Sequence, residues 1–164
     1  MIRSATAADA QAVCAIYNHF ILQSTVTFEE TAITPDDMAA RIGAGSGRLP
    51  FLLAELDGAV AGYAYAAPWK TRSAYRHTVE SSVYVAPGFA GLGLGSRLYQ
   101  ALLQDLRERD VHAVLAGIVL PNSASIGLHE AFGFAKVGQM REVGRKFGQW
   151  VDVGYWQLIF AAQA

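Results

Sequence analysis

The segment spanning residues 83–98 limits the fold more than any other part of this sequence. It predicts a strand that passes through a glycine-rich turn directly into an amphipathic helix. Glycines let consecutive amide N–H groups point to one side, and the first helical turn adds a partial positive charge. The turn contains Gly91, Gly93 and Gly95. The segment therefore predicts a cradle for a phosphate or pyrophosphate, with an ordinary surface loop as the alternative.

Hydrophobic periodicity in the rest of the chain predicts helices packed on a mixed sheet. Alternation and turn signals predict strands at 2–5, 51–56, 60–65, 79–85, 113–119 and 151–160, the last within a final strand pair. Helical spacing predicts one helix ending near Leu22, a second from Pro35 that ends before Gly43, a third containing Leu98, Leu102 and Leu106, and a fourth from about Asn122 to Gly133. Residues 43–47 are expected to form a flexible loop. The order predicts an α/β fold, with a mixed, mostly antiparallel twisted sheet and helices on both faces, in one domain over residues 1–164.

Composition and charge exclude several classes of protein. Lys and Arg number 13 against 14 Asp and Glu, so there is no bulk attraction to nucleic acid or to an anionic membrane. The hydrophobic fraction of 52% excludes a disordered chain. Cys14 is the single cysteine, and no His or Cys cluster has zinc-ligand spacing, so neither a disulfide nor a metal is expected. With no signal peptide and no transmembrane run, the expected location is the cytoplasm.

Two common phosphate-binding motifs do not fit the glycine turn. Ser96 stands where a dinucleotide fingerprint needs its third glycine, and the Gly-Lys-Ser/Thr of a P-loop is absent. The segment instead resembles the acetyl-CoA signature of the GCN5-related N-acetyltransferase (GNAT) superfamily, Gln/Arg-x-x-Gly-x-Gly/Ala. The six positions here are Ala90 to Gly95, so Ala90 replaces the Gln or Arg. That change removes one side-chain contact and leaves the backbone cradle in place.

Four further stretches narrow the resemblance to the phosphinothricin and methionine sulfoximine N-acetyltransferases, and together they extend it over nearly the whole chain. They are residues 67–75, 78–85, 122–130 and 154–158. The resemblance implies a splayed mixed sheet that holds acetyl-CoA in its opening, usually in a homodimer.

The resemblance also implies which residues contact acetyl-CoA. Oxyanion stabilisation and pantetheine alignment are expected from backbone N–H groups at a bulged strand end formed by Val83, Tyr84 and Val85. The pyrophosphate is expected on Gly91, Leu92, Gly93, Leu94, Gly95 and Ser96. Asn122 is expected on the pantetheine arm, and it can cap the following helix at the same time.

Glu80 and His129 are the expected catalytic residues. Alternation places Thr78, Glu80, Ser82 and Tyr84 on one strand face, and a half-buried carboxylate can have the raised pKa that suits a general base. A solvated strand glutamate is the alternative, which the motif match disfavours. His129 lies two helical turns after Asn122, and in the phosphinothricin branch a histidine at this position exchanges the proton of the CoA thiol. A structural helix histidine is the alternative.

A cationic segment at residues 69–77 is expected to hold the acidic groups of the substrate. The resemblance places Lys70, Arg72 and Tyr75 there, Phe28 as an aromatic wall, and Val153 beside it. A solvated basic loop is the alternative. Residues 144–150 are expected to form a second flexible basic loop that covers the site or meets a dimer partner.

These features predict an enzyme that moves acetyl from acetyl-CoA to the amine of a small anionic amino-acid analogue, phosphinothricin or methionine sulfoximine or sulfone. The alternatives are a broader amino-acid or antibiotic N-acetyltransferase, or a CoA-binding sensor without turnover. The expected partners are the small-molecule amine and a second copy of the chain, with no nucleic acid and no membrane.

Overall fold

The computed structural model describes residues 1–45 and 47–161. Within these residues seven strands form one sheet in the order β1-β2-β3-β4-β5-β7-β6. The strands are β1 (Ile2–Ser4), β2 (Phe51–Leu56), β3 (Ala59–Pro68), β4 (Thr78–Val85), β5 (Ala113–Val119), β6 (Ala135–Lys146) and β7 (Gln149–Ile159). Strands β4 and β5 run parallel, and the other neighbouring strands run antiparallel. The predicted fold class is therefore confirmed.

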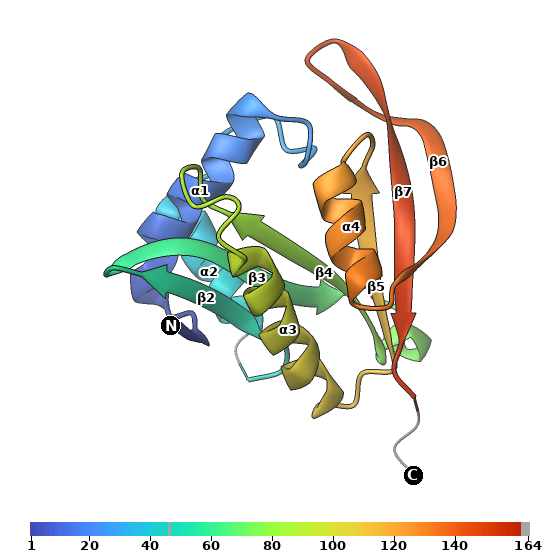
Figure 1. Ribbon diagram of the computed structural model, residues 1–164, viewed down its shortest axis with the longest axis horizontal. Helices are drawn as coiled ribbons and strands as arrows, with labels where there is room; N and C mark the ends of the chain where they lie inside the picture. The colour runs from blue at the N-terminus through green and yellow to red at the C-terminus, as the bar shows by residue number, and fades with distance from the viewer. Residues whose placement is uncertain (46, 162–164) are drawn as a thin grey trace.

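The helices α1 (Ala10–Gln23), α2 (Pro35–Gly45), α3 (Leu94–Arg107) and α4 (Ser123–Ala131) cover both faces of this sheet. Figure 1 shows α3 in front of β2, β3 and β4, and α2 behind them. Short 3-10 turns at Ala7–Asp9 and Ser73–Tyr75 precede α1 and β4. None of the described helices combines the length and the apolar character that crossing a membrane requires.

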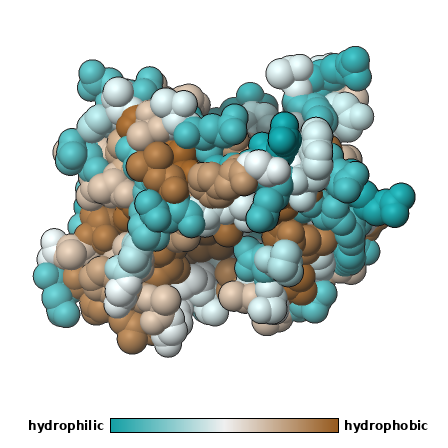
Figure 2. Space-filling view, turned by 90° about the horizontal axis from the view of Figure 1, so that it is seen from above, coloured by the Kyte–Doolittle hydropathy of each residue, from teal (hydrophilic) through white to brown (hydrophobic). Residues whose placement is uncertain are grey.

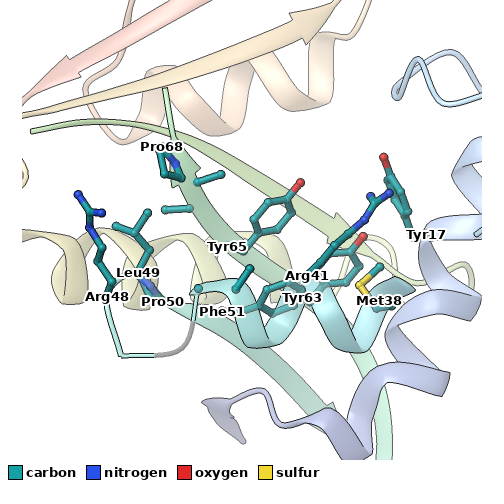
Figure 3. Close-up of a pocket in the computed structure, with 14 residues that line it drawn as sticks. Tyr17, Met38, Arg41, Arg48, Leu49, Pro50, Phe51, Tyr63, Tyr65 and Pro68 are labelled. Atoms are coloured by element: carbon teal, nitrogen blue, oxygen red, sulfur yellow. The ribbon is translucent and has the colours of Figure 1, made fainter. Parts of the chain in front are cut away.

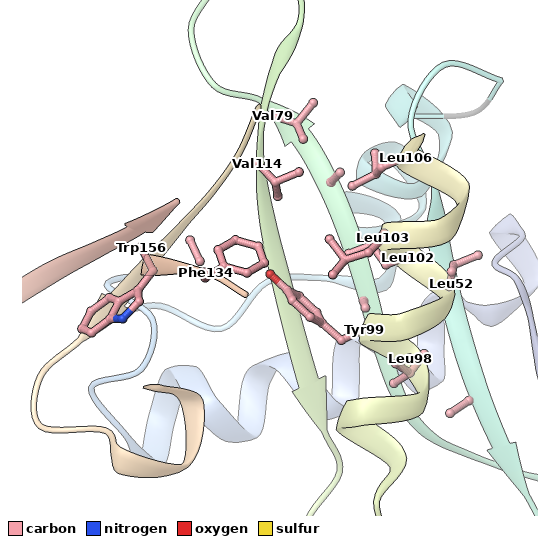
Figure 4. Packing of buried hydrophobic residues seen from close by; sticks show 14 of the residues in the cluster. Leu52, Val79, Leu98, Tyr99, Leu102, Leu103, Leu106, Val114, Phe134 and Trp156 are labelled. Atoms are coloured by element: carbon pink, nitrogen blue, oxygen red, sulfur yellow. The ribbon is translucent and has the colours of Figure 1, made fainter. Parts of the chain in front are cut away.

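One face of α3 supplies much of the larger core. Leu98, Leu102 and Leu106 are fully buried, as their spacing predicts, and they pack with Leu52 and Val114 of the sheet. Figure 4 shows this row of leucines on α3, with a tyrosine of the same helix directed toward the C-terminal half of the sheet. A second cluster on the opposite face joins α1 and α2 to β2 and β3. The sheet therefore has a core on each side.

Helix α2 continues farther than its sequence predicts. Thr34 and Asp37 cap its start, because the Asp37 N–H donates to Thr34 Oγ1 at 3.1 Å and the Thr34 N–H donates to Asp37 Oδ2 at 2.9 Å. The expected loop at 43–47 is wrong at its start, since Gly43 and Gly45 are helical. Gly47 is the residue that takes the left-handed conformation, with φ +84°. Ser46 lies outside the described residues.

The C-terminal strands form one long hairpin. Residues 144–150 were expected to be a flexible loop, and this expectation is wrong: β6 continues to Lys146 and β7 starts at Gln149. Phe147 and Gly148 form the two-residue turn with φ of +50° and +76°. Two positive φ angles are what a tight hairpin turn needs to match the twist of its strands. In Figure 1 the tip of this hairpin rises above the upper end of α1, across the opening from it.

Candidate active site

The sheet opens between β4 and β5. These strands pair only from Thr78–Ala113 to Glu80–Leu115, although both continue for several residues beyond. At the point of divergence Ser81 Oγ lies 3.3 Å from the carbonyl oxygen of Leu115, to which it donates, and 2.6 Å from the hydroxyl of Tyr99. The serine hydroxyl thus adds a side-chain hydrogen bond at the end of the β4–β5 ladder. The two strands therefore begin to separate at Ser81.

Main-chain groups of β4 face this opening. The Trp69 N–H bonds to Thr78 O and the Ala86 N–H bonds to Ala61 O, so the even-numbered residues of β4 direct their main chain toward β3. By alternation, Val83 and Val85 direct theirs toward the opening. The pairing with β3 shows no register shift, so the expected bulge is wrong. The donors of Val83 and Val85 are free because β5 diverges, whereas the main chain of Tyr84 faces β3.

The glycine turn delivers the start of α3 to the same opening. Gly91 and Gly93 have φ of +78° and +72°, and an added Cβ at either would meet nothing within 4 Å, so backbone conformation is what calls for glycine here. The first helical bond runs from Arg97 N to Gly93 O at 3.1 Å. The N–H groups of residues 94–96 therefore have no helical acceptor. Gly95 and Ser96 lie in the helix itself and not in a loop.

The side chains of Leu92 and Leu94 are not available to bind an anion on the glycine turn. The Leu94 side chain is buried in the core, and the Leu92 side chain is 55% exposed. An anion on this turn would thus meet main-chain donors, in agreement with the alanine at position 90.

Helix α4 contributes Asn122 and His129. Asn122 Oδ1 caps the helix by accepting from Ser125 N at 3.0 Å. His129 is buried, and its Nδ1 lies 2.7 Å from the carbonyl oxygen of Ser125. Because a carbonyl oxygen can only accept, Nδ1 carries the proton and Nε2 carries the lone pair. Burial lowers the pKa of His129, which favours this neutral form.

A cleft of about 330 Å³, here called the helix cleft, joins these groups. It is lined by residues of β4, β5, α3 and α4, including Val83, Val85, Gly95, Asn122 and His129. Nε2 of His129 is the one buried side-chain nitrogen or oxygen without a hydrogen-bond partner within residues 1–45 and 47–161. An unsatisfied buried acceptor and free N–H donors around one cleft fit a polar ligand such as acetyl-CoA. No group of three or more His, Cys, Asp or Glu in the described part of the chain could hold a metal.

A second cavity of about 410 Å³, here called the hairpin cavity, adjoins the helix cleft. Ser82, Tyr84 and Gly117 line both, so the two meet at the opening of the sheet. Figure 2 looks onto this end of the molecule, where hydrophobic residues are exposed beside hydrophilic ones between the two halves. Because they share these wall residues, the two cavities form one site that can be entered from two sides.

Glu80 lines the hairpin cavity, and its carboxylate lies over Gly117 of β5. An added Cβ on Gly117 would come within 3.0 Å of Glu80 Oε1 and 3.3 Å of the Tyr155 ring, so the carboxylate crosses the strand where a side chain is missing. Burial raises the pKa of Glu80, and the charge of Lys70 opposes this shift. Glu80 is thus a half-buried carboxylate at the opening, as predicted from alternation.

The hairpin and the segment after α1 cover the cavity together. Phe28 and Val153 both line it, as the resemblance implies. The Phe28 ring packs on the backbone of Gly144, where an added Cβ would lie only 2.3 Å from a ring carbon. Lys146 is buried and donates from Nζ to the carbonyl oxygen of Thr27 at 2.8 Å. These contacts join two segments that are more than 100 residues apart in the chain.

The cationic segment reaches the cavity only in part. Lys70 lies over the Trp69 ring at 4.6 Å, and Trp69 meets Tyr155 of the cavity wall edge to face at 5.5 Å. Arg72 and Tyr75 are exposed in and beside the 3-10 turn, and neither is among the residues that line the hairpin cavity. The structure therefore brings together Phe28, Glu80 and Val153 in this cavity. Lys70 does not line the cavity and acts on Glu80 only through its charge, and Arg72 and Tyr75 do not line it either.

Sequence reasoning missed several residues that line this cavity, among them Gly117 and Tyr155, and it did not foresee that Lys146 holds the hairpin on Thr27. A glycine inside a strand signals close approach of another group, so Gly117 could have been found. Lys146 carried no such signal, because its partner is a carbonyl oxygen on a distant segment. Tyr155 lay within a matched stretch but had no recognised role.

Comparisons with known proteins agree with this geometry. A family model described as an acetyltransferase (GNAT) domain matches residues 2–154. A phosphinothricin N-acetyltransferase of Streptomyces viridochromogenes is 48% identical over 163 residues, covering 99% of this chain and 89% of that protein. An L-methionine sulfoximine/L-methionine sulfone acetyltransferase of Salmonella typhimurium is 39% identical, covering 96% of this chain and 92% of that protein.

The same agreement extends to solved structures. An acetyltransferase from Salmonella typhimurium, solved with its cofactor acetyl-CoA, superposes with a TM-score of 0.96 at 38% identity and covers 100% of this chain and 95% of its own. The family model covers most of the chain, and the relatives match it over nearly their full length. The sheet also opens between β4 and β5, as the resemblance implies. The chain therefore belongs to the GNAT acetyltransferase family.

Proposed function

We propose that the protein transfers an acetyl group to the amine of a small anionic amino-acid analogue, phosphinothricin or methionine sulfoximine or sulfone. The observation that carries this proposal is the half-buried carboxylate of Glu80, which lines the hairpin cavity beside Gly117, a residue that lines both cavities. When bound, acetyl-CoA supplies the acetyl group as a thioester. The helix cleft would hold the cofactor and the hairpin cavity the amine, so that the amine attacks directly within one complex.

Glu80 is proposed as the general base. An amino acid reaches the site as an ammonium, which must lose a proton before it can attack. A carboxylate whose pKa is raised by burial takes up a proton more readily than a solvated one. Glu80 accepts this proton directly or through one water molecule.

Main-chain donors and His129 complete the proposed chemistry. The N–H groups of Val83 and Val85 donate to the carbonyl oxygen of the acetyl group, and those of residues 94–96 donate to the pyrophosphate. Asn122 contacts the pantetheine arm while it caps α4. Nε2 of His129 carries a lone pair, so it would accept a proton that the amine releases on acylation and return it to the sulfur as the C–S bond breaks. Nδ1 stays protonated on Ser125 throughout.

The acidic group of the substrate is proposed to lie toward Lys70. This ammonium is close enough to the cavity to oppose the pKa shift of Glu80. Arg72 and Tyr75 would meet the substrate only after a movement of their loop. Phe28 and Val153 would pack on the apolar part of the substrate.

The exposed apolar side chains of the hairpin support a homodimer. Met140 and Val143 are about half exposed, and Phe147 and Trp150 are 58% and 61% exposed. Met140 and Val143 also line the hairpin cavity, so a partner chain bound there would help to close it. The proposal also includes a single domain over residues 1–164. The proposed location is the cytoplasm, whose reducing conditions keep the Cys14 thiol free.

A screen of free amines tests this function. Purified protein, acetyl-CoA and a thiol reagent are mixed with phosphinothricin, methionine sulfoximine, methionine sulfone, common amino acids and polyamines. The expected result is thiol release that is fastest, by kcat/KM, for the anionic analogues. Faster turnover of ordinary amino acids would assign the broader acetyltransferase instead. Acetyl-CoA binding without thiol release from any amine would identify a sensor and disprove the proposal.

A further inference from the structure

A third cavity of about 310 Å³ adjoins the hairpin cavity and shares one wall with it. It is formed between α2 and the strands β2 and β3, and we call it the tyrosine pocket. Its walls include Met38, Arg41, Ala44, Arg48, Phe51 and Tyr65. A cavity of about 150 Å³ suffices for benzene, so this pocket has room for one aromatic ring with a short polar chain.

Near-parallel aromatic rings form the floor of the pocket. Phe51 stacks on Tyr65 with ring centroids 5.1 Å apart and planes 12° apart, and on Tyr63 at 5.5 Å and 10°. Phe51 and Tyr65 face each other across the β2–β3 ladder, which holds both rings in register. Both are only partly buried, so they leave aromatic surface for a planar group.

The two arginines at the pocket differ in what they already bind. Arg41 donates to both carboxylate oxygens of Glu29 at 2.7 and 3.1 Å, and Glu29 also accepts from the Tyr17 hydroxyl at 2.9 Å. Its charge is therefore already neutralised. Arg48 is exposed, and Figure 3 shows it with Leu49 at one end of the pocket, while Arg41, Met38 and Tyr17 lie at the other and Tyr65 between. The positive charge available to a ligand is that of Arg48.

We propose that the tyrosine pocket binds a small aromatic carboxylic acid, with its ring on Phe51 and Tyr65 and its carboxylate at Arg48. Aromatic stacking supplies the apolar part of this recognition, and the planar guanidinium fork supplies the charged part.

This second site is coupled to the hairpin cavity through a shared wall. Tyr17, Tyr65 and Ala67 line both cavities. A ring that packs on one side of Tyr65 restricts the positions open to it on the other side. By linkage, each ligand changes the affinity of the other by the same factor.

Calorimetric titration with 3-phenylpropionate, in the absence of acetyl-CoA, tests binding independently of turnover. The expected result is saturable binding of one molecule per chain, with Kd on the order of 0.1–1 mM for a ligand of this size. Ala44→Phe fills the pocket and should weaken binding at least tenfold. Ala40→Phe, on an exposed position of the same helix that does not line the pocket, is the matched control and should leave Kd unchanged.

Two further comparisons test the recognition and the coupling. Arg48→Gln should remove the preference for 3-phenylpropionate over the neutral 3-phenylpropionamide. Saturating 3-phenylpropionate should change the KM for the amine substrate at least twofold in the parent and leave it unchanged in Ala44→Phe. Absence of binding up to 10 mM, or binding that Ala44→Phe does not weaken, would overturn the site. Binding without any change in KM would overturn the coupling.

Discussion

The helix cleft and the hairpin cavity share the opening between β4 and β5, yet they are built in different ways. The helix cleft uses main-chain donors and a helix cap that come from short stretches of sequence, residues 83–96 and 122–129. The hairpin cavity is assembled from α1, β4 and the β6–β7 hairpin, which meet only in the folded chain. The proposed cofactor side is thus specified locally, and the proposed amine side by tertiary contacts.

This difference matches the demands of the two ligands. Acetyl-CoA presents the same pyrophosphate and pantetheine groups whichever amine is acetylated, and backbone donors bind these groups with little dependence on side-chain identity. The amine differs from one enzyme to another, and side chains on distant segments can change without disturbing the cofactor. Substitutions on the two sides should therefore have separable effects.

The largest effect is expected for Glu80→Gln. Loss of a general base lowers rates by roughly 10²- to 10⁴-fold, so kcat/KM for the amine should fall at least 100-fold. The Kd for acetyl-CoA should stay unchanged, because Glu80 lies on the amine side. Steady-state kinetics and calorimetry measure the two effects, with Glu108→Gln on the surface as a control.

The pH profile of the parent sharpens this prediction. The base must be ionised, so kcat/KM should decline on acidification through a pKa above the ordinary glutamate value of about 4.3. Glu80→Gln should lack this decline on the acidic side of the profile. An unchanged decline in the variant would assign the titration to another group.

Gly144→Ala should act on the amine side alone. The new Cβ would overlap the Phe28 ring, which has to leave its position on the hairpin. We expect the KM for the amine to rise about tenfold, since one or two contacts can change preference by that much. The KM for acetyl-CoA is the internal control. Equal increases in both would show that the two sides are not separable.

Gly91→Ala should act on the cofactor side alone, for a different reason. Its Cβ meets no atom, but φ of +78° is strained for alanine and costs about 1 kcal/mol. We expect the KM for acetyl-CoA to rise a few-fold. Gly43→Ala is the contrasting control, because this glycine is inside α2 and alanine there should raise the free energy of unfolding by about 0.5–1 kcal/mol.

The smallest expected effect is the contribution of His129 to the pH dependence of the free energy of unfolding. Its folded-state pKa is below the unfolded value of about 6.5, so the unfolded chain binds a proton first as the pH falls. The free energy of unfolding should therefore decline from pH 7 toward pH 5. His129→Gln should show a smaller decline in urea titrations over this range. An identical decline in both proteins would contradict a buried neutral histidine.

Local sequence was sufficient to predict most of the elements that form the helix cleft. The bounds of β2 and β5 agree with the prediction, and Asn122 caps α4 as its residue type indicates. The alanine at position 90 already indicated that main-chain groups would replace a side-chain contact. These features depend on neighbours within a few residues, which is the range over which propensity and capping act.

Tertiary contacts limited what could be predicted on the amine side. Charge and aromatic content made residues 144–150 look like a loop, whereas Phe147 and Gly148 form a tight turn and Lys146 is buried on Thr27. Arg72 was expected in the site from the resemblance and from the charge of its segment, and neither determines where a loop places its side chains. The bulge expected at Val83–Val85 was unnecessary, because divergence of β5 frees the same donors.

Ser81 holds the point from which both cavities widen. Its hydroxyl bonds to the Leu115 carbonyl and to Tyr99, so it sets where β4 and β5 separate. A change at this position would move the walls of both cavities at once. Redesign for a bulkier amine should therefore leave Ser81 unchanged and alter the hairpin, where a wider cavity does not displace the cofactor.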